Sequence, residues 1–293
     1  MAENEKSSGP ISSFFRDKVA IITGASSGIG EDAALELGRL GARLVLLARR
    51  KRELEDLARK IKDGGGSALA IPCDVARKHD VEEAIGKVRH SFDRIDILVN
   101  SAGVLIPGPI EELADEDLNR MMTVNLYGAL HVMQAVIPVM RRQGAGNIVN
   151  VASLAGRRGF SPLGGYSATK FALVGLTEAL RMELFGSGIR VSLVMPGVID
   201  TPMTSNAKME EVLEEFPAFF GMPVRWVTWA ILAAIAFGLT EVDVPPGAGI
   251  VEKMASLMPG VTDTVLSVGS SMARVAGRLL RGRPASEVKR GED

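Results

Sequence analysis

The chain has 293 residues, a length that fits one large α/β domain with appended segments. Its 46% hydrophobic and 24% charged residues can form a buried core and exclude a disordered or collagen-like chain. Because 34 lysines and arginines nearly cancel 35 aspartates and glutamates, the overall charge gives no indication of nucleic-acid binding. The single cysteine, Cys73, excludes an intramolecular disulfide, and the 3 histidines are too scattered for a metal site, so we expect no metal.

The amino-terminal segment, residues 1–16, is polar and lacks the apolar run of a secretory signal, which predicts a flexible tail. The longest apolar stretch, 226–239, is shorter than the roughly 20 residues that a membrane-spanning helix needs. It predicts a core helix. The single cysteine fits a reducing compartment, so we expect a cytoplasmic protein.

Short β-branched runs alternate with longer helical patterns between residues 18 and 244, which is typical of βαβ units. We therefore expect one doubly wound α/β domain over 17–245, with a seven-stranded parallel sheet flanked by helices on both faces. Right-handed crossovers would bring the carboxyl ends of the strands to one edge, where such sheets bind ligands. The expected strands are 19–23, 43–48, 68–71, 95–99, 147–151, 190–195 and 241–244.

A glycine-rich turn follows the first expected strand and precedes a helical pattern. Gly24 permits a tight turn, Gly28 lets the backbone approach a pyrophosphate, and Gly30 lets the helix pack close to the strand. Unpaired N–H groups at the helix start would attract phosphate. A simple turn could explain the glycines alone, but their place at a strand-to-helix junction predicts a nucleotide site. Its candidate contacts are Gly24, Ser26, Ser27, Gly28, Ile29 and Gly30.

The second expected strand ends at Ala48, where an NAD-binding fold would place an acid for the ribose hydroxyls. Ala48 cannot bind a diol, whereas Arg49 and Arg50 can neutralise a 2′-phosphate through charge-assisted N–H bonds. These residues favour NADP(H) over NAD(H). The alternative is that the arginines belong to the solvated start of the next helix.

A second group of polar residues follows the fifth expected strand. Ser153 comes at its end, and Tyr166 and Lys170 share one face of the next helix because they are four residues apart. A lysine cation favours the tyrosine phenolate and brings proton transfer within reach at neutral pH. Ser153 could hydrogen-bond a substrate oxygen on which negative charge develops.

Together these motifs resemble those of the short-chain dehydrogenase/reductase family, which is related to the Rossmann nucleotide-binding enzymes. The resemblance covers approximately residues 18–244 and implies a Rossmann-like domain. It rests on residues in the family's order and approximate spacing, namely Thr23-Gly24-x-x-x-Gly28-x-Gly30, Asn100-Ser101-Ala102-Gly103, Asn125, Ser153, Tyr166-x-x-x-Lys170 and Pro196-Gly197.

The resemblance implies a role for each catalytic candidate. Tyr166 would be the general acid in carbonyl reduction and the base in alcohol oxidation, while Lys170 would lower its pKa and bind the nicotinamide ribose. Ser153 would orient the substrate carbonyl, and Asn125 would hold a water that links Lys170 to solvent. The further cofactor contacts that it implies are Asp74 and Val75 at the adenine, Asn100, Ala102 and Gly103 under the cofactor, and Pro196, Gly197, Ile199 and Thr201 around the carboxamide.

Three of these roles have simpler alternatives. Asn125 could satisfy backbone groups within a helix, Thr201 could cap the following segment, and Asp74 could cap a turn.

The sequence departs from the commonest family wording at two positions. Ser101 stands where a second asparagine is frequent, and Ser27 stands where many NADP-dependent members have a basic residue. The second departure leaves recognition of the 2′-phosphate mainly to Arg49, helped by the Ser26 hydroxyl.

Apolar residues dominate the segment that sets substrate choice in the family, about 201–223, and the stretch between Ser153 and Tyr166. They predict an apolar pocket for a hydrophobic ketone, aldehyde or secondary alcohol, although the same side chains could pack a lid onto the core or a second subunit. The chain is thus expected to be an NADP(H)-dependent oxidoreductase. A catalytically silent NADP(H)-binding regulatory or scaffold protein is the alternative. The apolar residues are Leu154, Phe160, Leu163, Met203, Met209, Val212, Leu213, Phe216, Phe219 and Phe220.

The resemblance also implies a homodimer or homotetramer, formed through the long helices at 115–142 and 166–185. After a Pro/Gly-rich boundary at 245–249, residues 246–293 predict a helical C-terminal extension. Its apolar stripe predicts packing on the parent domain, and contact with a membrane surface or a partner is the alternative. The stripe consists of Val261, Val265, Val268, Met272, Val275 and Leu279.

Overall fold

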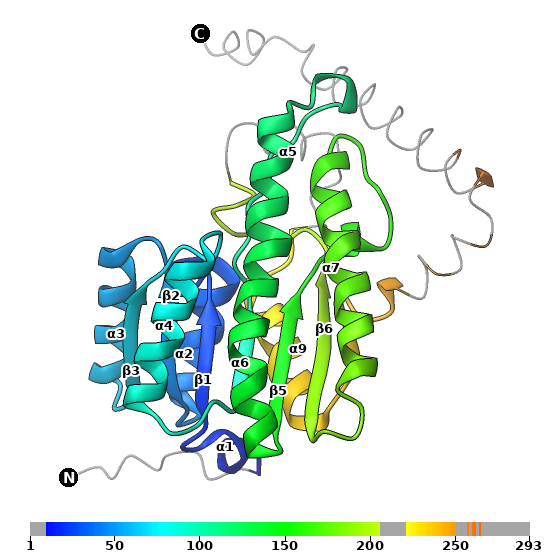
Figure 1. The fold of residues 1–293 in the computed structure, drawn as a ribbon. Coiled ribbons are helices and arrows are strands. Elements are labelled where there is room, and N and C mark those ends of the chain that lie inside the picture. Colours follow the sequence, from blue (N-terminus) through cyan, green and yellow to red (C-terminus); the bar gives the residue numbers. More distant parts are fainter. Residues whose placement is uncertain are drawn as a thin grey trace, which may run out of the picture.

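The computed structural model describes residues 10–205 and 221–249, together with the single positions 253, 257, 260, 261 and 264. Within this part of the chain, one central sheet carries helices on both faces (Figure 1). The predicted doubly wound, Rossmann-like α/β fold is confirmed.

Seven parallel strands build the sheet, in the order β3-β2-β1-β4-β5-β6-β7. The order runs outward from β1 on one side and from β4 on the other, so a topological switch point lies between these two strands. Ligands of open α/β sheets bind at the carboxyl ends of the strands beside such a point. The strands are β1 (Val19–Thr23), β2 (Arg43–Ala48), β3 (Ser67–Pro72), β4 (Ile97–Asn100), β5 (Gly146–Val151), β6 (Ile189–Pro196) and β7 (Glu241–Val244).

Strands β1, β2 and β7 have the predicted bounds, and the others differ by one or two residues at an end. The start of β4 shows why. Ile95 N donates to Gln143 Oε1 at 2.8 Å, and Gln143 Nε2 donates to Ile95 O at 2.8 Å. Because a side-chain amide takes the place of a neighbouring strand there, β4 begins two residues later than the hydrophobic run predicted.

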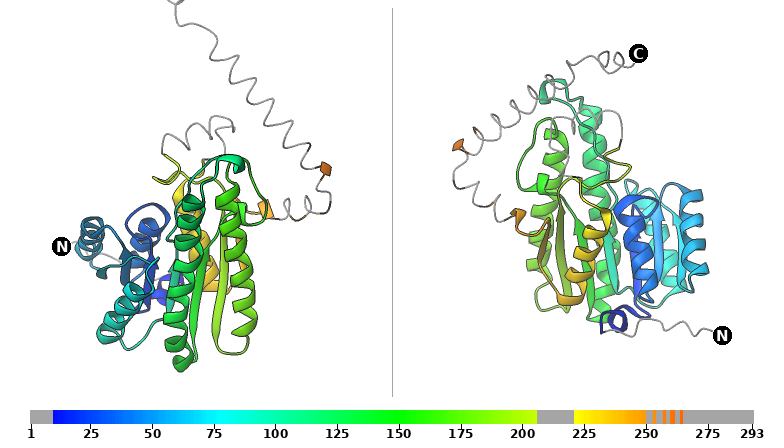
Figure 2. Two further views of the ribbon diagram at one scale, coloured as in Figure 1. Left: turned by 45° about the horizontal axis from the view of Figure 1, so that its top comes forward. Right: turned by 180° about the vertical axis from the view of Figure 1, so that it is seen from behind.

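Helices cover both faces of the sheet because successive strand residues point to opposite sides. Ala20 and Ile22 join one core with α2 (Gly28–Arg39), α3 (Lys51–Asp63) and α9 (Val224–Phe237). Val19 and Ile21 join the other core with α4 (Lys78–Ser91), α6 (Ala129–Gln143) and α7 (Gly164–Glu183). In Figure 1, α4, α6 and α7 lie in front of the sheet, and the view from behind in Figure 2 shows α2 and α9 on the opposite face.

The segment before β1 differs from the predicted tail. Residues Pro10–Phe15 form α1, at the edge of the sheet where the strands begin (Figure 1). Phe15 is fully buried in the core, and its ring makes a T-shaped contact with Phe14 at 5.0 Å between centroids. Burial of an aromatic ring stabilises this helix on the domain. Residues 1–9 of the predicted tail lie outside the described residues.

A long helical stretch runs through α5 (Asp115–Met122), the π-helix η2 (Thr123–Gly128) and α6. Of the described helices, this stretch is long and apolar enough to cross a membrane, judged by length and composition alone. Yet α6 buries Val132, Val136 and Met140 against the sheet, as a core helix does. The apolar stretch at 226–239 corresponds to α9, which packs in the first core as predicted.

Two predicted regions fall largely outside the described residues. Of the C-terminal stripe, the structure describes Val261 alone, which is helical and 56% exposed. Of the segment at 201–223, residues 206–220 are not described.

Candidate active site

The glycine-rich turn has the close approaches that its sequence predicts. Gly24 has φ +67°, and a Cβ added there would lie 2.8 Å from the Cα of Ala102. A Cβ on Gly30 would lie 2.5 Å from the carbonyl oxygen of Gly24. Glycine is needed at both positions, because a side chain would displace either the loop after β4 or the start of α2.

The same turn meets the segment that follows β6. Gly28 has φ +60°, and a Cβ there would come within 3.3 Å of the Thr201 side chain. Thr201 is buried, and its backbone N–H donates to Thr204 Oγ1 at 3.2 Å. Thr201 therefore packs against the glycine turn and also belongs to a local turn, and its contact with the carboxamide stays a prediction.

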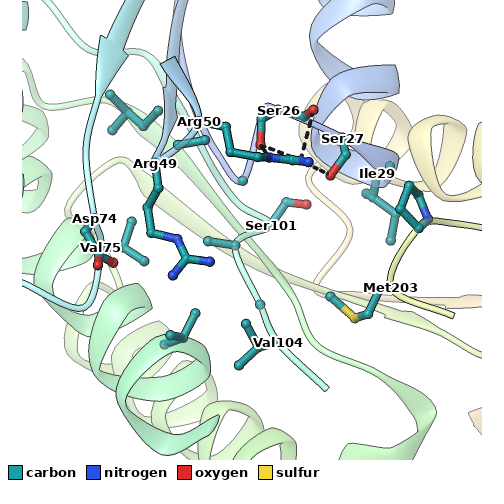
Figure 3. Close-up of a pocket in the computed structure, with 18 of the residues that line it drawn as sticks. Ser26, Ser27, Ile29, Arg49, Arg50, Asp74, Val75, Ser101, Val104 and Met203 are labelled. Carbon is teal, nitrogen blue, oxygen red and sulfur yellow. Dashed lines mark hydrogen bonds between the residues drawn. The ribbon is translucent and has the colours of Figure 1, made fainter. Parts of the chain in front are cut away.

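A cavity of about 220 Å³ opens at the carboxyl ends of β1, β2 and β4 (Figure 3). Its walls come from the glycine turn, the end of β2, the loop after β3, the loop after β4 and the segment after β6. The predicted contacts that line it are Gly24, Ser26, Ser27, Gly28, Ile29, Arg49, Arg50, Asp74, Val75, Ala102, Gly103 and Thr201.

The two arginines after β2 take different directions. Arg49 extends into the cavity, between the Asp74 loop and Val104 (Figure 3). Arg50 instead turns to the glycine loop, where Nη2 donates to Ser26 Oγ at 2.9 Å and to Ser27 Oγ at 2.7 Å. Both arginines remain in the cavity wall, but only the guanidinium of Arg50 is bound to other described side chains there.

Other predicted contacts lie behind the cavity wall. Asn100 is buried, and its Nδ2 donates to Asn150 Oδ1 at 2.9 Å, so its side chain braces β4 against β5. Gly197 packs near Met222 and Leu154. The described cavity is not lined by Gly30, Asn100, Pro196, Gly197 or Ile199, whose cofactor contacts stay predictions.

Several lining residues were missed by the sequence analysis. Leu47, Cys73, Val104, Val124 and Pro202 also line the cavity. They are apolar residues beside recognised motif positions, and no chemical signature distinguishes them from core residues. Their positions next to Ala48, Asp74, Gly103, Asn125 and Thr201 were the one usable signal.

The loop after β3 presents Asp74 and Val75 to the cavity. Asp74 Oδ1 accepts from Ala76 N at 3.1 Å, which is the turn-capping alternative, while the residue also lines the cavity. Val75 O lies 3.0 Å from Nδ1 of His131 on α6. The loop after β3 is therefore stabilised by a hydrogen bond within itself and by a hydrogen bond with α6.

The catalytic candidates lie next to this cavity, behind the part of its wall formed by Gly103. Tyr166 and Lys170 are buried on α7, and the Lys170 Nζ lies 5.6 Å from the centre of the Tyr166 ring. Lys170 Nζ donates to Val151 O at 3.0 Å. A Cβ on Gly103 would lie 3.9 Å from Lys170 Nζ, so the amine is adjacent to the cavity wall.

Ser153 begins the short 3₁₀ turn η3 (Leu154–Gly156) directly after β5. Its Oγ accepts from Ala155 N at 3.1 Å and donates to Pro196 O at 3.2 Å. The Ser153 side chain lies near enough to the Tyr166 hydroxyl to lower its pKa by hydrogen bonding. The tertiary structure thus brings Ser153, Tyr166 and Lys170 together as the sequence predicts.

Burial sets the protonation of this group. It raises the pKa of Tyr166 to about 12, against a smaller lowering by the hydrogen bond with Ser153. It also lowers the pKa of Lys170 to about 8. Burial is the largest influence on the pKa of Tyr166, and the lowering of this pKa by Lys170 stays a prediction.

Asn125 lies in the π-helix η2 and is buried. Its Oδ1 accepts from Val104 N at 2.8 Å, and its Nδ2 donates to Val104 O at 2.9 Å and to Thr169 Oγ1 at 3.0 Å. Both amide hydrogens are thus used to hold the loop after β4 and the helix α7 together. The predicted water between Asn125 and Lys170 stays a prediction.

The family model described as short chain dehydrogenase matches residues 18–212. This chain belongs to the short-chain dehydrogenase family. The resemblance seen in the sequence is thereby confirmed, and this short-chain dehydrogenase is an oxidoreductase of a family that uses a nicotinamide cofactor on small-molecule substrates.

Curated relatives cover most of the same region. An uncharacterized oxidoreductase of Staphylococcus epidermidis is 37% identical over 196 residues, which are 67% of this chain and 84% of the relative. An uncharacterized oxidoreductase of Staphylococcus saprophyticus is 36% identical over 228 residues, 77% of this chain and 91% of the relative.

A solved structure supports the same relationship. A phenylalanine-to-tryptophan variant of actinorhodin polyketide ketoreductase, crystallised with NADPH, superposes on this short-chain dehydrogenase with a TM-score of 0.73. The two are 32% identical, and the match covers 80% of this chain and 97% of the ketoreductase.

Proposed function

We propose that this short-chain dehydrogenase is an NADP(H)-dependent carbonyl reductase, which in reverse oxidises a secondary alcohol. The observation that carries this assignment is the position of Arg49. Its guanidinium extends into the cavity beside Ala48, which offers no acceptor for ribose hydroxyls. A guanidinium binds a 2′-phosphate through directional, charge-assisted hydrogen bonds. The NADPH of the solved ketoreductase agrees with this choice.

The cavity residues fit a dinucleotide. Gly24 and Gly30 let the turn pack closely, because added Cβ atoms would meet Ala102 and Gly24, and the start of α2 would bind the pyrophosphate through its N–H groups. In our proposal, Asp74 and Val75 contact the adenine, and Ala102 and Gly103 lie under the cofactor. Pro196, Gly197, Ile199 and Thr201 would surround the carboxamide.

A bound nicotinamide would supply hydride for reduction and accept it for oxidation. The chain's own contribution is proton transfer. With its pKa raised to about 12, Tyr166 is protonated at neutral pH, the form that a general acid needs to protonate a reduced carbonyl oxygen. The hydroxyl of Ser153, at the same site, would donate a hydrogen bond to that oxygen.

Lys170 would restore the proton. Its pKa of about 8 lies near neutrality, so its amine can change protonation state during turnover. The amine lies next to Gly103 at the cavity wall, where a cofactor ribose would also bind. Asn125 would complete the path by holding the loop at Val104 and a water.

The surroundings of Tyr166 support an apolar substrate. Tyr166 packs in a cluster with Met121 and Ala155. Six partly buried apolar side chains pack against this cluster, so a charged substrate would lose hydration among them. We therefore assign a hydrophobic ketone, aldehyde or secondary alcohol as the substrate class. The neighbours are Val104, Leu105, Ile106, Leu113, Phe160 and Leu163.

We further propose a homodimer or homotetramer in the cytoplasm. Tyr127 on the stretch at 115–143 and Phe171 on α7 are 48% and 45% exposed. Large apolar side chains on exposed helix faces are typical of subunit contacts.

The test is NADPH consumption with a panel of hydrophobic ketones and aldehydes, run in parallel with NADH. Tyr166→Phe is the catalytic variant, and Tyr127→Phe is the matched control because it alters the other of the 2 tyrosines. We expect turnover that prefers NADPH, disappears in Tyr166→Phe and persists in Tyr127→Phe. Tight NADPH binding without turnover across the panel would instead favour the silent binding protein.

A further inference from the structure

An ion-pair cluster joins the turn after Ser153 to the last strand of the sheet. Arg157 Nη2 donates to Glu241 Oε2, although 84 residues separate them in the sequence. Lys253 Nζ lies 3.4 Å from the same oxygen. The side chains of Arg157 and Glu241 are 14% and 24% exposed, whereas that of Lys253 is 62% exposed. The pair between Arg157 and Glu241 is therefore the sheltered part of the cluster.

Charge and hydrogen bonding make Glu241 the essential partner of this arginine. Burial alone would raise the pKa of the Glu241 carboxyl, but the charges and hydrogen bonds of Arg157 and Lys253 hold it below its ordinary value. The Nε of Arg157 is buried and has no hydrogen-bond partner among the described residues. Without the Glu241 carboxylate, the charged guanidinium of Arg157 would be more stable if it turned toward solvent and became hydrated.

The backbone between Arg157 and Ser153 is a continuous hydrogen-bonded turn. Arg157 N donates to Leu154 O at 2.9 Å, and Gly156 N donates to Ser153 O at 2.8 Å. Ala155 N donates to Ser153 Oγ at 3.1 Å. A displacement of Arg157 is therefore transmitted to the hydroxyl of Ser153.

The turn is also packed tightly against the catalytic helix. A Cβ added to Gly156 would lie 2.9 Å from the carbonyl oxygen of Lys170. One side of the turn is thus fixed by α7, and the opposite anchor is the ion pair with β7. The hydroxyl of Ser153 is also bonded to Pro196 O at 3.2 Å, and the ion pair adds a fixed point at the far end of the turn.

We propose that Arg157 and Glu241 are positioning residues, which hold the turn so that the Ser153 hydroxyl meets Tyr166 and the substrate oxygen. The effect of this positioning on turnover rests on the proposed function. The effect of the ion pair on the position of the turn does not. Lys253 is the outer, solvent-screened partner of the same carboxylate and contributes little.

The test compares Glu241→Gln and Arg157→Met with Lys253→Gln as the matched control. Arg157→Met leaves Glu241 paired with Lys253, so it carries the test if Glu241→Gln does not fold. Hydrogen exchange at 153–158 measures the turn, and steady-state kinetics measure its consequence. Both variants are expected to exchange about tenfold faster there and to lose about tenfold in kcat, with KM for NADPH changed less than about twofold. Arg157→Lys should retain most of kcat, and Lys253→Gln should match the parent protein.

Unchanged exchange at 153–158 in both variants would overturn the positioning role. So would a fall in kcat accompanied by an equal weakening of NADPH binding, because general loosening would explain it. If the parent protein turns over no carbonyl, the proposed function fails, and faster exchange confined to 153–158 still supports the positioning of Ser153.

Discussion

Arg50 donates a hydrogen bond of 2.7 Å to the Ser27 hydroxyl, which ties the end of β2 to the glycine turn after β1. Its neighbour Arg49 extends into the cavity instead (Figure 3). The two adjacent arginines thus make different contacts in the structure. Arg50 stabilises the loop, and Arg49 presents a positive charge to whatever enters the cavity.

Replacing Arg49 with Ala should weaken NADPH binding about 30-fold and leave NADH binding nearly unchanged, because a charge-assisted bond to the 2′-phosphate would be lost. Arg52→Ala, an exposed change at the second residue of α3, is the control and should alter neither affinity. Fluorescence titration with each cofactor measures the effect. Equal losses for both cofactors would contradict the assignment of Arg49.

Gly30→Ala should destabilise the protein by about 3 kcal/mol, because the new Cβ would lie 2.5 Å from a backbone oxygen that cannot move freely. Cofactor binding should fall with it. Gly86→Ala in α4 is the matched control, since nothing lies within 4 Å of its added Cβ. Replacing a helical glycine there should raise stability by about 0.5 kcal/mol. Urea unfolding measures the free energy of unfolding of both variants. Equal changes in the two would show that the close approach of α2 to the glycine turn is not critical.

The buried Lys170 predicts a specific pH dependence of stability. Its pKa is about 8 in the folded protein and 10.5 as the ordinary value, so between these values the unfolded chain binds more protons. The contribution of Lys170 to the free energy of unfolding should therefore rise with pH through this window, by on the order of 2 kcal/mol. The raised pKa values of Cys73 and Tyr166 oppose this rise above about pH 9, so the Lys170 contribution is the difference between the parent protein and Lys170→Met. Lys170→Met should remove this rise.

The measurement is urea unfolding of the cofactor-free protein at steps between about pH 7 and 10. Lys87→Met, on the exposed side of α4, reports the effect of removing a surface lysine charge. The same pH slope in the parent protein and in Lys170→Met would argue against a neutral buried amine.

Asn125→Ala should lower the free energy of unfolding by about 2 kcal/mol, because it leaves the backbone N–H and carbonyl of Val104 without their side-chain partner. The loop after β4 should then loosen and turnover should fall. Asn119→Ala, an exposed change in the same helical stretch, should have little effect. Unfolding curves and NADPH oxidation rates measure both; a stable but inactive Asn125→Ala would assign this residue to proton transfer rather than to loop support.

Local patterns were enough to locate most of the fold. The strands β1, β2 and β7 have their predicted bounds because alternating and β-branched runs report burial directly. The glycine turn was equally readable, since the contact that requires Gly30 is with Gly24 in the same motif, although the contact of Gly24 with Ala102 joins distant segments. Tyr166 and Lys170 were paired correctly because helical spacing places residues four apart on one face.

The sequence by itself thus determined the sheet, the glycine turn and the Ser153, Tyr166 and Lys170 group. Only the tertiary structure decided where Arg49 and Arg50 point, that Phe15 is buried, and that Glu241 holds Arg157. These tertiary contacts join segments far apart in the chain, so the periodicity and spacing of residues do not predict them. They arise when the folded sheet brings charged and apolar side chains together and removes them from water.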